Sequence, residues 1–221
     1  MEIFIEILDG LILGDACLER RKKTHNARYH HECVHYTYMN YIKQVINQTD
    51  TFIVSDFYPK ERPTLPNSTY TVCSYVHEIL TEQEERWYTN RIKHIPEDIR
   101  LTPNVLKHWY IGDGWLSWNT SNKRYKEGWN PIHGICFATE GFSFEDTDIL
   151  LDKMKALGFP CGRGKDNNMS LRGSLVKDFL SYIGTPTCDC YDYKWQIGDR
   201  GLYENLKNTC SCTRENQQPS L

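Results

Sequence analysis

Two short stretches of this chain end in the same way, and their repetition is the strongest constraint on its fold. The first, LDGLILGDA (Leu8 to Ala16), is an apolar run that ends in a small residue, an aspartate and a small residue. The second, LKHWYIGDG (Leu106 to Gly114), has the same ending. Asp15 and Asp113 therefore hold equivalent places. Because self-similarity within a chain indicates a structural repeat, this pattern predicts two copies of one unit.

The elements expected after each aspartate follow one order. Alternating apolar residues predict strands, and apolar residues three or four apart predict helices. The first copy gives strands at 17–20 and 27–35, a helix at 36–49, strands at 51–58 and 68–76 around a proline-rich loop at 59–67, and a helix at 77–88. The second copy gives strands at 115–119 and 133–141, a helix at 143–158, a hairpin at 161–174 and a helix at 174–184.

Each copy therefore reads helix, two strands, helix, two strands, helix. Agreement over this many elements is a far more specific signal than one nine-residue match. The sequence predicts an α+β protein with two αββαββα halves, at 1–100 and 101–200, followed by a C-terminal tail at 201–221.

An aspartate directly after an apolar helix places a carboxylate among backbone carbonyls that lack partners. One such ending alone is usually only a helix cap and a turn. Two of them side by side would form an all-oxygen site suited to Mg²⁺, with Mn²⁺ as an expected substitute, and to displacement at a phosphodiester. Gly10 and Gly14 would leave one face of the first helix bare, so that a second helix could approach closely. The candidate metal ligands are Asp15, Asp113, Gly14 and Gly112.

On these residues the chain resembles the LAGLIDADG homing endonucleases, in the single-chain form that carries two copies of the nine-residue motif. The resemblance extends to the order of elements and to KHIPEDIRLTP (93–103) before the second motif. The chain departs from the motif at Ala16, at the bulky run 107–110, and at Asp9, which would favour a helix N-terminus. None of these departures removes a metal-binding aspartate.

The resemblance implies that the two motif helices pack at the centre and that two saddle-shaped antiparallel sheets cover the major groove of DNA. It implies a monomer that binds a long asymmetric target in double-stranded DNA and makes a double-strand break with short 3′ overhangs. Asp15 and Asp113 would each serve the cut in one strand. Lys93 and Lys194 follow the last helix of each copy and match the lysines that assist catalysis in the family.

Charge is segregated along the chain, although the formal net charge is only −3. Residues 20–31 carry five Lys/Arg and no acid, whereas 77–85 and 140–152 together carry nine Asp/Glu and no Lys/Arg. Basic strand turns would contact phosphates and base edges, and the acidic helices would face away. The candidate DNA-binding residues are Arg20, Arg21, Lys22, Lys23, Arg28, Lys60, Arg62, Asn122, Lys123, Arg124, Lys126, Arg163, Lys165 and Arg172.

The chain has nine cysteines, and its N-terminus lacks the basic region that is typical of an export signal. These two features indicate reduced thiols. No apolar run reaches the length of a membrane span. We therefore expect no membrane partner and an intracellular, reducing location: the cytoplasm of a prokaryote or phage-infected cell, or an organelle. The histidines at 30, 31 and 35 are expected at the surface or facing DNA. A structural Zn²⁺ is a weaker hypothesis because its C-x-C spacing is unusually tight; its ligands would be Cys188, Cys190, Cys210 and Cys212.

Two alternatives to the nuclease stay open. An RNA maturase would use the same fold to help intron RNA splice, and a non-cleaving protein would only recognise DNA. Neither needs both aspartates, and both are present. The sequence therefore favours a metal-dependent endonuclease.

Overall fold

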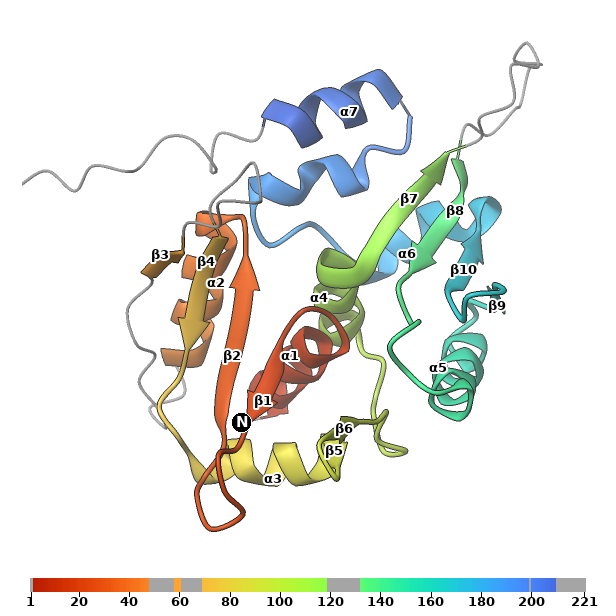
Figure 1. Ribbon diagram of the computed structural model, residues 1–221. Coiled ribbons are helices and arrows are strands. Elements are labelled where there is room, and N and C mark those ends of the chain that lie inside the picture. Colours follow the sequence, from red (N-terminus) through yellow and green to blue (C-terminus); the bar gives the residue numbers. More distant parts are fainter. Residues whose placement is uncertain (1, 48–57, 61–68, 119–131, 199, 210–221) are drawn as a thin grey trace, which may run out of the picture.

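The computed structural model describes residues 2–47, 58–60, 69–118, 132–198 and 200–209. Its centre is a pair of helices, α1 (Glu2–Leu13) and α4 (Pro103–Asp113), which lie against each other (Figure 1). Thr102 caps α4 by accepting the Val105 N–H, and Pro103 occupies the first turn. Every residue of α1 from Ile7 to Leu13 is buried, which is typical of a helix with neighbours on all sides.

Two four-stranded antiparallel sheets flank this pair, the first on the left of Figure 1 and the second on the right. Their strand orders are β1-β2-β4-β3 and β7-β8-β10-β9. The arrangement of strands is thus the same in both sheets. The strands are β1 (Cys17–Glu19), β2 (Arg28–Cys33), β3 (Tyr58–Lys60), β4 (Thr69–Cys73), β7 (Gly114–Trp118), β8 (Ile132–Phe137), β9 (Cys161–Arg163) and β10 (Met169–Arg172).

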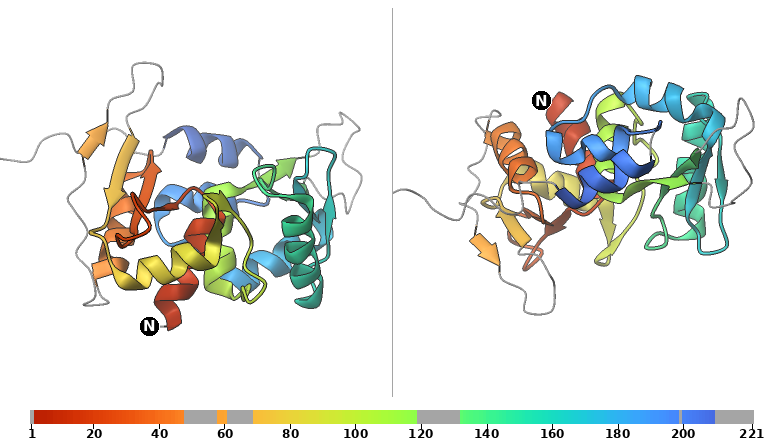
Figure 2. Two further views of the ribbon diagram at one scale, coloured as in Figure 1. Left: turned by 60° about the horizontal axis from the view of Figure 1, so that its bottom comes forward. Right: turned by 90° about the horizontal axis from the view of Figure 1, so that it is seen from above.

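Helices cover the inner face of each sheet. The views in Figure 2 show α2 (Tyr36–Asn47) beside the first sheet, and α5 (Phe144–Ala156) and α6 (Val176–Ile183) beside the second. Ser143 caps α5 through the Asp146 N–H, and Gly158 follows it with φ +86°. One hydrophobic core joins both sheets to the central helices. The α+β class with antiparallel sheets is confirmed.

Several elements join the copies or follow them. Helix α3 (Glu78–Trp87) leads into a two-stranded ribbon, β5 (Tyr88–Thr89) and β6 (Ile92–Lys93). After the 3₁₀ turn η1 (Gly173–Leu175) and α6 come a 3₁₀ segment, η2 (Asp189–Trp195), and helix α7 (Arg200–Thr209). Among the described residues, no helix combines the length and the apolar character needed to cross a bilayer.

The structure differs from the sequence prediction in several elements. Strand β3 begins at Tyr58, the last residue of the expected strand at 51–58, whose other residues lie outside the described ones, and it continues into the expected loop. Pro59 is tolerated there because β3 is an edge strand that lacks a neighbour on one side. The ribbon β5–β6 was not predicted, since two-residue strands carry no periodic signal. The expected tail at 201–221 begins as a helix, α7, whereas the rest of it lies outside the described residues.

Candidate active site

The C-terminal ends of α1 and α4 meet at two glycines. A Cβ atom added to Gly14 would lie 3.3 Å from the Cα atom of Gly112, and one added to Gly112 would lie 3.2 Å from the Cα atom of Gly14. One turn earlier, a Cβ atom on Gly10 would lie 2.4 Å from the carbonyl oxygen of Val105. The expected bare face of the first helix is confirmed, and it is what allows the backbones to touch.

This contact brings the two aspartates to one place. Asp113 is the last residue of α4, and Asp15 lies two residues beyond the end of α1. A Cβ atom on Gly112 would lie 3.6 Å from Asp15 Oδ2. Solvent reaches Asp15, whereas Asp113 is half-buried.

Both carboxyl groups are easier to protonate than an ordinary aspartate. Desolvation raises the pKa of Asp113 to about 7, and the charge of Asp15 adds to the rise. Desolvation also raises the pKa of Asp15, although solvent reaches it, while Lys194 and Lys93 act in the opposite direction. A bound cation would relieve the cost of two carboxylates at one partly desolvated place. Their oxygens, at the carbonyl ends of two helices, are donors that hard divalent cations prefer. The residues therefore fit a divalent metal ion.

The pKa of Asp113 leads to a prediction for the metal-free protein. The folded-state value of about 7 lies above the ordinary 3.8. The stability that this carboxyl contributes is therefore complete below about pH 4 and is lost as the pH rises through 7. In EDTA, Asp113→Asn should raise the free energy of unfolding by about 1–3 kcal/mol at pH 8 and by less at pH 5. Urea unfolding at both pH values measures this. The exposed Asp152→Asn is the control, and an equal gain at both pH values would contradict the burial of a charged carboxylate.

Two lysines bind the backbone carbonyls at the ends of the two helices. Lys93, on β6, donates from Nζ to the carbonyl oxygens of Ile12 at 2.6 Å and Gly14 at 3.5 Å. Lys194, on η2, donates to those of Tyr110 at 3.1 Å, Ile111 at 2.6 Å and Gly114 at 2.6 Å. These carbonyls belong to the last turns of α1 and α4 and to the residue that follows each helix, Gly14 and Gly114.

Each ammonium group thus supplies positive charge where the helix dipole is negative. Desolvation lowers the pKa of Lys194 to about 8, against the opposite effect of Asp15 and Asp113. Desolvation also lowers the pKa of Lys93. The structure brings together all four residues expected to be catalytic, with the lysines bound to the helix ends.

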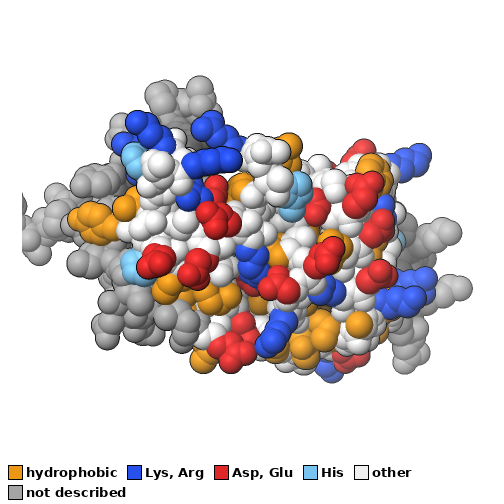
Figure 3. All heavy atoms as spheres, turned by 90° about the horizontal axis from the view of Figure 1, so that it is seen from below, with side chains coloured by type: hydrophobic (Ala, Val, Ile, Leu, Met, Phe, Trp, Pro, Cys, Tyr) orange, Lys and Arg blue, Asp and Glu red, His pale blue; other side chains and the backbone are white. Residues whose placement is uncertain are grey.

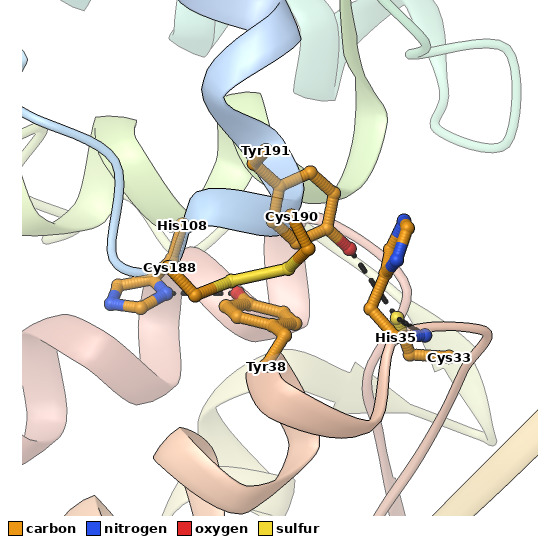
Figure 4. The surroundings of a disulfide bond; sticks show 7 residues. All are labelled: Cys33, His35, Tyr38, His108, Cys188, Cys190 and Tyr191. Atoms are coloured by element: carbon orange, nitrogen blue, oxygen red, sulfur yellow. Dashed lines mark hydrogen bonds between the residues drawn. A yellow bond between two sulfur atoms is a disulfide. The ribbon is translucent and has the colours of Figure 1, made fainter. Parts of the chain in front are cut away.

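The segment that carries Lys194 is anchored to α4 and to the first sheet with its helix α2. Tyr110 donates its hydroxyl to the carbonyl of Lys194 at 2.7 Å, so the two residues bind each other twice. Figure 4 shows Tyr191 of η2 reaching Cys33 at the end of β2, where its hydroxyl oxygen lies 3.3 Å from Sγ. The ring of Tyr191 also packs edge-on against Tyr38 of α2. This link from η2 to β2 and α2 fixes the position of the segment that carries the Lys194 ammonium.

The expectations of reduced thiols and of a structural zinc site need correction at this segment. A disulfide joins Cys188 and Cys190 at the start of η2 (Figure 4), so the expectation of reduced thiols is wrong for this pair. Neither sulfur is then a thiolate for the hypothetical structural zinc, whose other ligands, Cys210 and Cys212, lie outside the described residues. Among the described residues, the cysteines outside this disulfide are Cys17, Cys33, Cys73, Cys136 and Cys161, and these are not disulfide-bonded.

The expectation of surface histidines is wrong for His31. Its ring is buried and shares a 2.8 Å hydrogen bond with the hydroxyl of Tyr29, and burial lowers its pKa to about 3. His35 packs edge-on against Tyr191, and burial lowers its pKa to about 4. Of the three histidines, only His30 lies on the partly exposed side of β2. Alternation along the strand explains the difference, because neighbouring residues face opposite sides of the sheet.

Asp9 also has a different role from the one expected. It lies in the second half of α1, buried, and not near the helix N-terminus. Arg86 of α3 binds both of its carboxylate oxygens, at 2.6 and 3.1 Å, and the Trp87 indole N–H donates to it at 2.9 Å. The carboxylate therefore ties α3, and the ribbon that carries Lys93, to the central helix.

The candidate DNA-binding residues whose side chains the structure describes divide into two groups. Five have exposed side chains: Arg21, Lys22, Lys23, Lys165 and Arg172. Three are ion-paired, Arg20 with Glu84 and Glu85, Arg28 with Glu19, and Arg163 with Asp148. Arg62, Asn122, Lys123, Arg124 and Lys126 lie outside the described residues, as does the side chain of Lys60.

The expected separation of basic turns from acidic helices is wrong at α3. In Figure 3, Lys and Arg side chains gather at the upper left edge of this face, and acidic and basic side chains alternate below them. The hollow between the β1–β2 turn (20–27) and the β5–β6 turn is lined by Lys22, Lys23 and Arg91 together with Glu84 and Glu85. Arg91 was not among the residues predicted from the sequence. The residue before it, Asn90, has φ 52° in the turn, and because asparagine favours such turns, a turn could have been predicted here.

The comparisons with known proteins agree with this geometry. A structure described as the homing endonuclease I-WcaI bound to its DNA recognition sequence has a TM-score of 0.75 and 22% identity, with 90% of this chain and 88% of that one covered. The N-terminal LAGLIDADG domain of DUF199/WhiA has a TM-score of 0.51 and 14% identity, with 84% of each chain covered. Both show the same fold.

Sequence comparison gives a relative and a family. "Uncharacterized protein MJ1098" of Methanocaldococcus jannaschii is 29% identical over 207 residues, which span 85% of this chain and 74% of the relative. The model of the LAGLIDADG DNA endonuclease family matches residues 5–178, a range that includes both helix ends, both aspartates and both sheets. With its two aspartates held at glycine-paired helix ends, the chain belongs to the LAGLIDADG DNA endonuclease family.

Proposed function

We propose that this protein is a site-specific homing endonuclease that makes a double-strand break in DNA. The observation that carries the proposal is the meeting of Asp15 and Asp113 at the Gly14–Gly112 contact, where Asp113 has a pKa of about 7. A purely structural role would not need two carboxylates at a place where desolvation disfavours their charge. A metal-binding role accounts for both, since a cation would offset the unfavourable charge.

The residues have separate tasks in this proposal. Asp15 and Asp113, with the carbonyls of Gly14 and Gly112, would hold Mg²⁺, or Mn²⁺ in its place. When bound, the metal supplies an activated water and stabilises charge on the phosphate. Lys93 and Lys194 hold the helix-end carbonyls, keep both aspartates in position and place positive charge beside them. The lysines thus act through the helix ends.

The repeated architecture sets the form of the target. Halves at 1–100 and 101–200, each with one motif helix and one sheet, would place two similar but non-identical sheets on one duplex. A single chain with two such copies would bind as a monomer to a long asymmetric site, and one aspartate would serve each strand. Exposed side chains at the strand turns, Arg21, Lys22, Lys23, Lys165 and Arg172, would contact phosphates. Short 3′ overhangs are the expected product.

The test is cleavage of a randomised duplex library, sequenced after incubation with Mg²⁺ and, in parallel, with Ca²⁺. The wild type should cut one long motif in Mg²⁺ and leave short 3′ overhangs, and it should bind the same motif in Ca²⁺ without cutting. The double variant Asp15→Asn/Asp113→Asn is the matched control and should bind without cutting in either metal.

Other outcomes would overturn the proposal in different ways. Specific retention of DNA by the wild type without cutting would identify a recognition protein. Neither cutting nor retention of DNA, together with binding to structured intron RNA, would identify a maturase.

A further inference from the structure

Three different metal-binding side chains meet on the outward side of the first sheet. Cys17 and Glu19 alternate with the buried Leu18 on β1, and His30 lies directly opposite Cys17 on β2. Cys17 Sγ lies 3.7 Å from His30 Nδ1, and Glu19 Oε1 lies 4.0 Å from the same nitrogen. One ligand atom from each of the three lies within 4.8 Å of the others. The proposed mechanism of cleavage uses none of these side chains.

We propose that Cys17, Glu19 and His30 form a binding site for one Zn²⁺ ion. A sulfur, an imidazole nitrogen and a carboxylate oxygen are the ligand types that zinc takes, whereas Mg²⁺ prefers oxygen alone. Ligands at zinc distances in a tetrahedron lie about 3.3–3.7 Å from one another. The first measured separation is already of this size and the second is slightly larger. Small side-chain rotations would therefore bring all three ligands into range of one ion, and a water molecule would take the fourth position of the tetrahedron.

Arg28 holds one of the ligands, Glu19, in the orientation that this site needs, and Glu32 lies close to a second ligand, His30. Arg28 binds Glu19 through Oε2, at 2.6 and 2.9 Å, and leaves Oε1 on the side of His30. His30 Nε2 lies 3.9 Å from Glu32 Oε1. A histidine that binds metal through one nitrogen commonly has its other nitrogen oriented by a carboxylate. Glu32 is placed for this positioning role.

The second sheet shows that the arrangement is not a general feature of the fold. The corresponding set there is Trp115, Ser117 and Cys136: Trp115 pairs with Cys136 as Cys17 pairs with His30, and Ser117 lies two residues further along β7, as Glu19 does along β1. It holds a cysteine but neither a histidine nor a carboxylate. Of the two sheets, the first therefore carries the proposed site, and Cys136, a cysteine of the second sheet without such neighbours, provides a control for the loss of a thiol.

The test is titration of the full-length, metal-free protein with Co²⁺, a spectroscopic substitute for zinc, under reducing conditions. One of the ions that the wild type binds should give a thiolate-to-cobalt absorption band, and added Zn²⁺ should remove that band; an ion at the all-oxygen site of Asp15 and Asp113 would give no such band. Cys17→Ser should abolish the band, His30→Gln should weaken binding by at least about tenfold, and Glu32→Gln should weaken it by about 10–100-fold. Cys136→Ser should behave as the wild type.

Two results would overturn the proposal. One is a wild type without the band, and the other is a band of full strength in Cys17→Ser, which would place the ion on other cysteines. Far-UV circular dichroism checks that each variant is folded. If Cys17→Ser is not folded, His30→Gln provides the test, and Co²⁺ binding as tight as in the wild type would overturn the proposal. Because the readout is metal binding in the absence of DNA, its failure would leave the proposed endonuclease untouched. Failure to cut DNA would, in turn, leave the zinc site intact.

Discussion

Asp113→Asn should lower the rate of double-strand cleavage by on the order of 10³-fold and leave sequence-specific binding in Ca²⁺ nearly unchanged. Asparagine has almost the same shape as aspartate, so the contact between Gly14 and Gly112 is preserved. It lacks the negative charge that a divalent cation needs, at the site where desolvation raises the pKa of Asp113 to about 7. Loss of cutting without loss of binding is the signature of a residue that acts on the reacting phosphate.

The two aspartates should differ in which strand they serve. Because Asp15 is intact in Asp113→Asn, nicked duplex should accumulate, and Asp15→Asn should nick the opposite strand. Denaturing gels with a different label on each strand measure both products. Cleavage of both strands by either single variant at the wild-type rate would show that the aspartates do not act as a pair.

Lys194→Met should slow cleavage by about 10²–10³-fold with a much smaller effect on DNA binding, and should lower the free energy of unfolding by about 1–3 kcal/mol. The ammonium group of Lys194 is buried and donates to three backbone carbonyls at the end of α4. Methionine keeps the length and apolar stem but leaves those oxygens without a donor. The end of α4 would then shift, and Asp113 with it.

Two matched lysines make this result specific. Lys93→Met should give a smaller loss, because Lys93 makes one short hydrogen bond, to Ile12, and one long one, to Gly14. Lys153 also donates to a carbonyl, that of Glu97 at 2.7 Å, but on the surface. Lys153→Met should leave cleavage as it is. Equal losses of cleavage and binding in Lys194→Met would argue against a role at the helix end.

Much of the architecture could be predicted from local sequence signals. The apolar runs before Asp15 and Asp113 are helices, and the glycines beside these aspartates are at the contact between them. The antiparallel strands of both copies follow from alternation, and Ser143 caps a helix as its spacing indicates. These features repeat at fixed spacing or involve residues close in the chain, so the sequence alone carries them.

The tertiary structure decided which distant groups meet. Asp9 is paired with Arg86, 77 residues away, and Lys194 reaches carbonyls more than 80 residues before it. The burial of His31 and the grouping of Cys17, Glu19 and His30 depend on which side of a sheet each residue faces. No periodic signal encodes such partners, because a buried polar group needs a partner without specifying its sequence distance. The sequence determined the two aspartates and the helices that carry them, and packing determined which charges surround them.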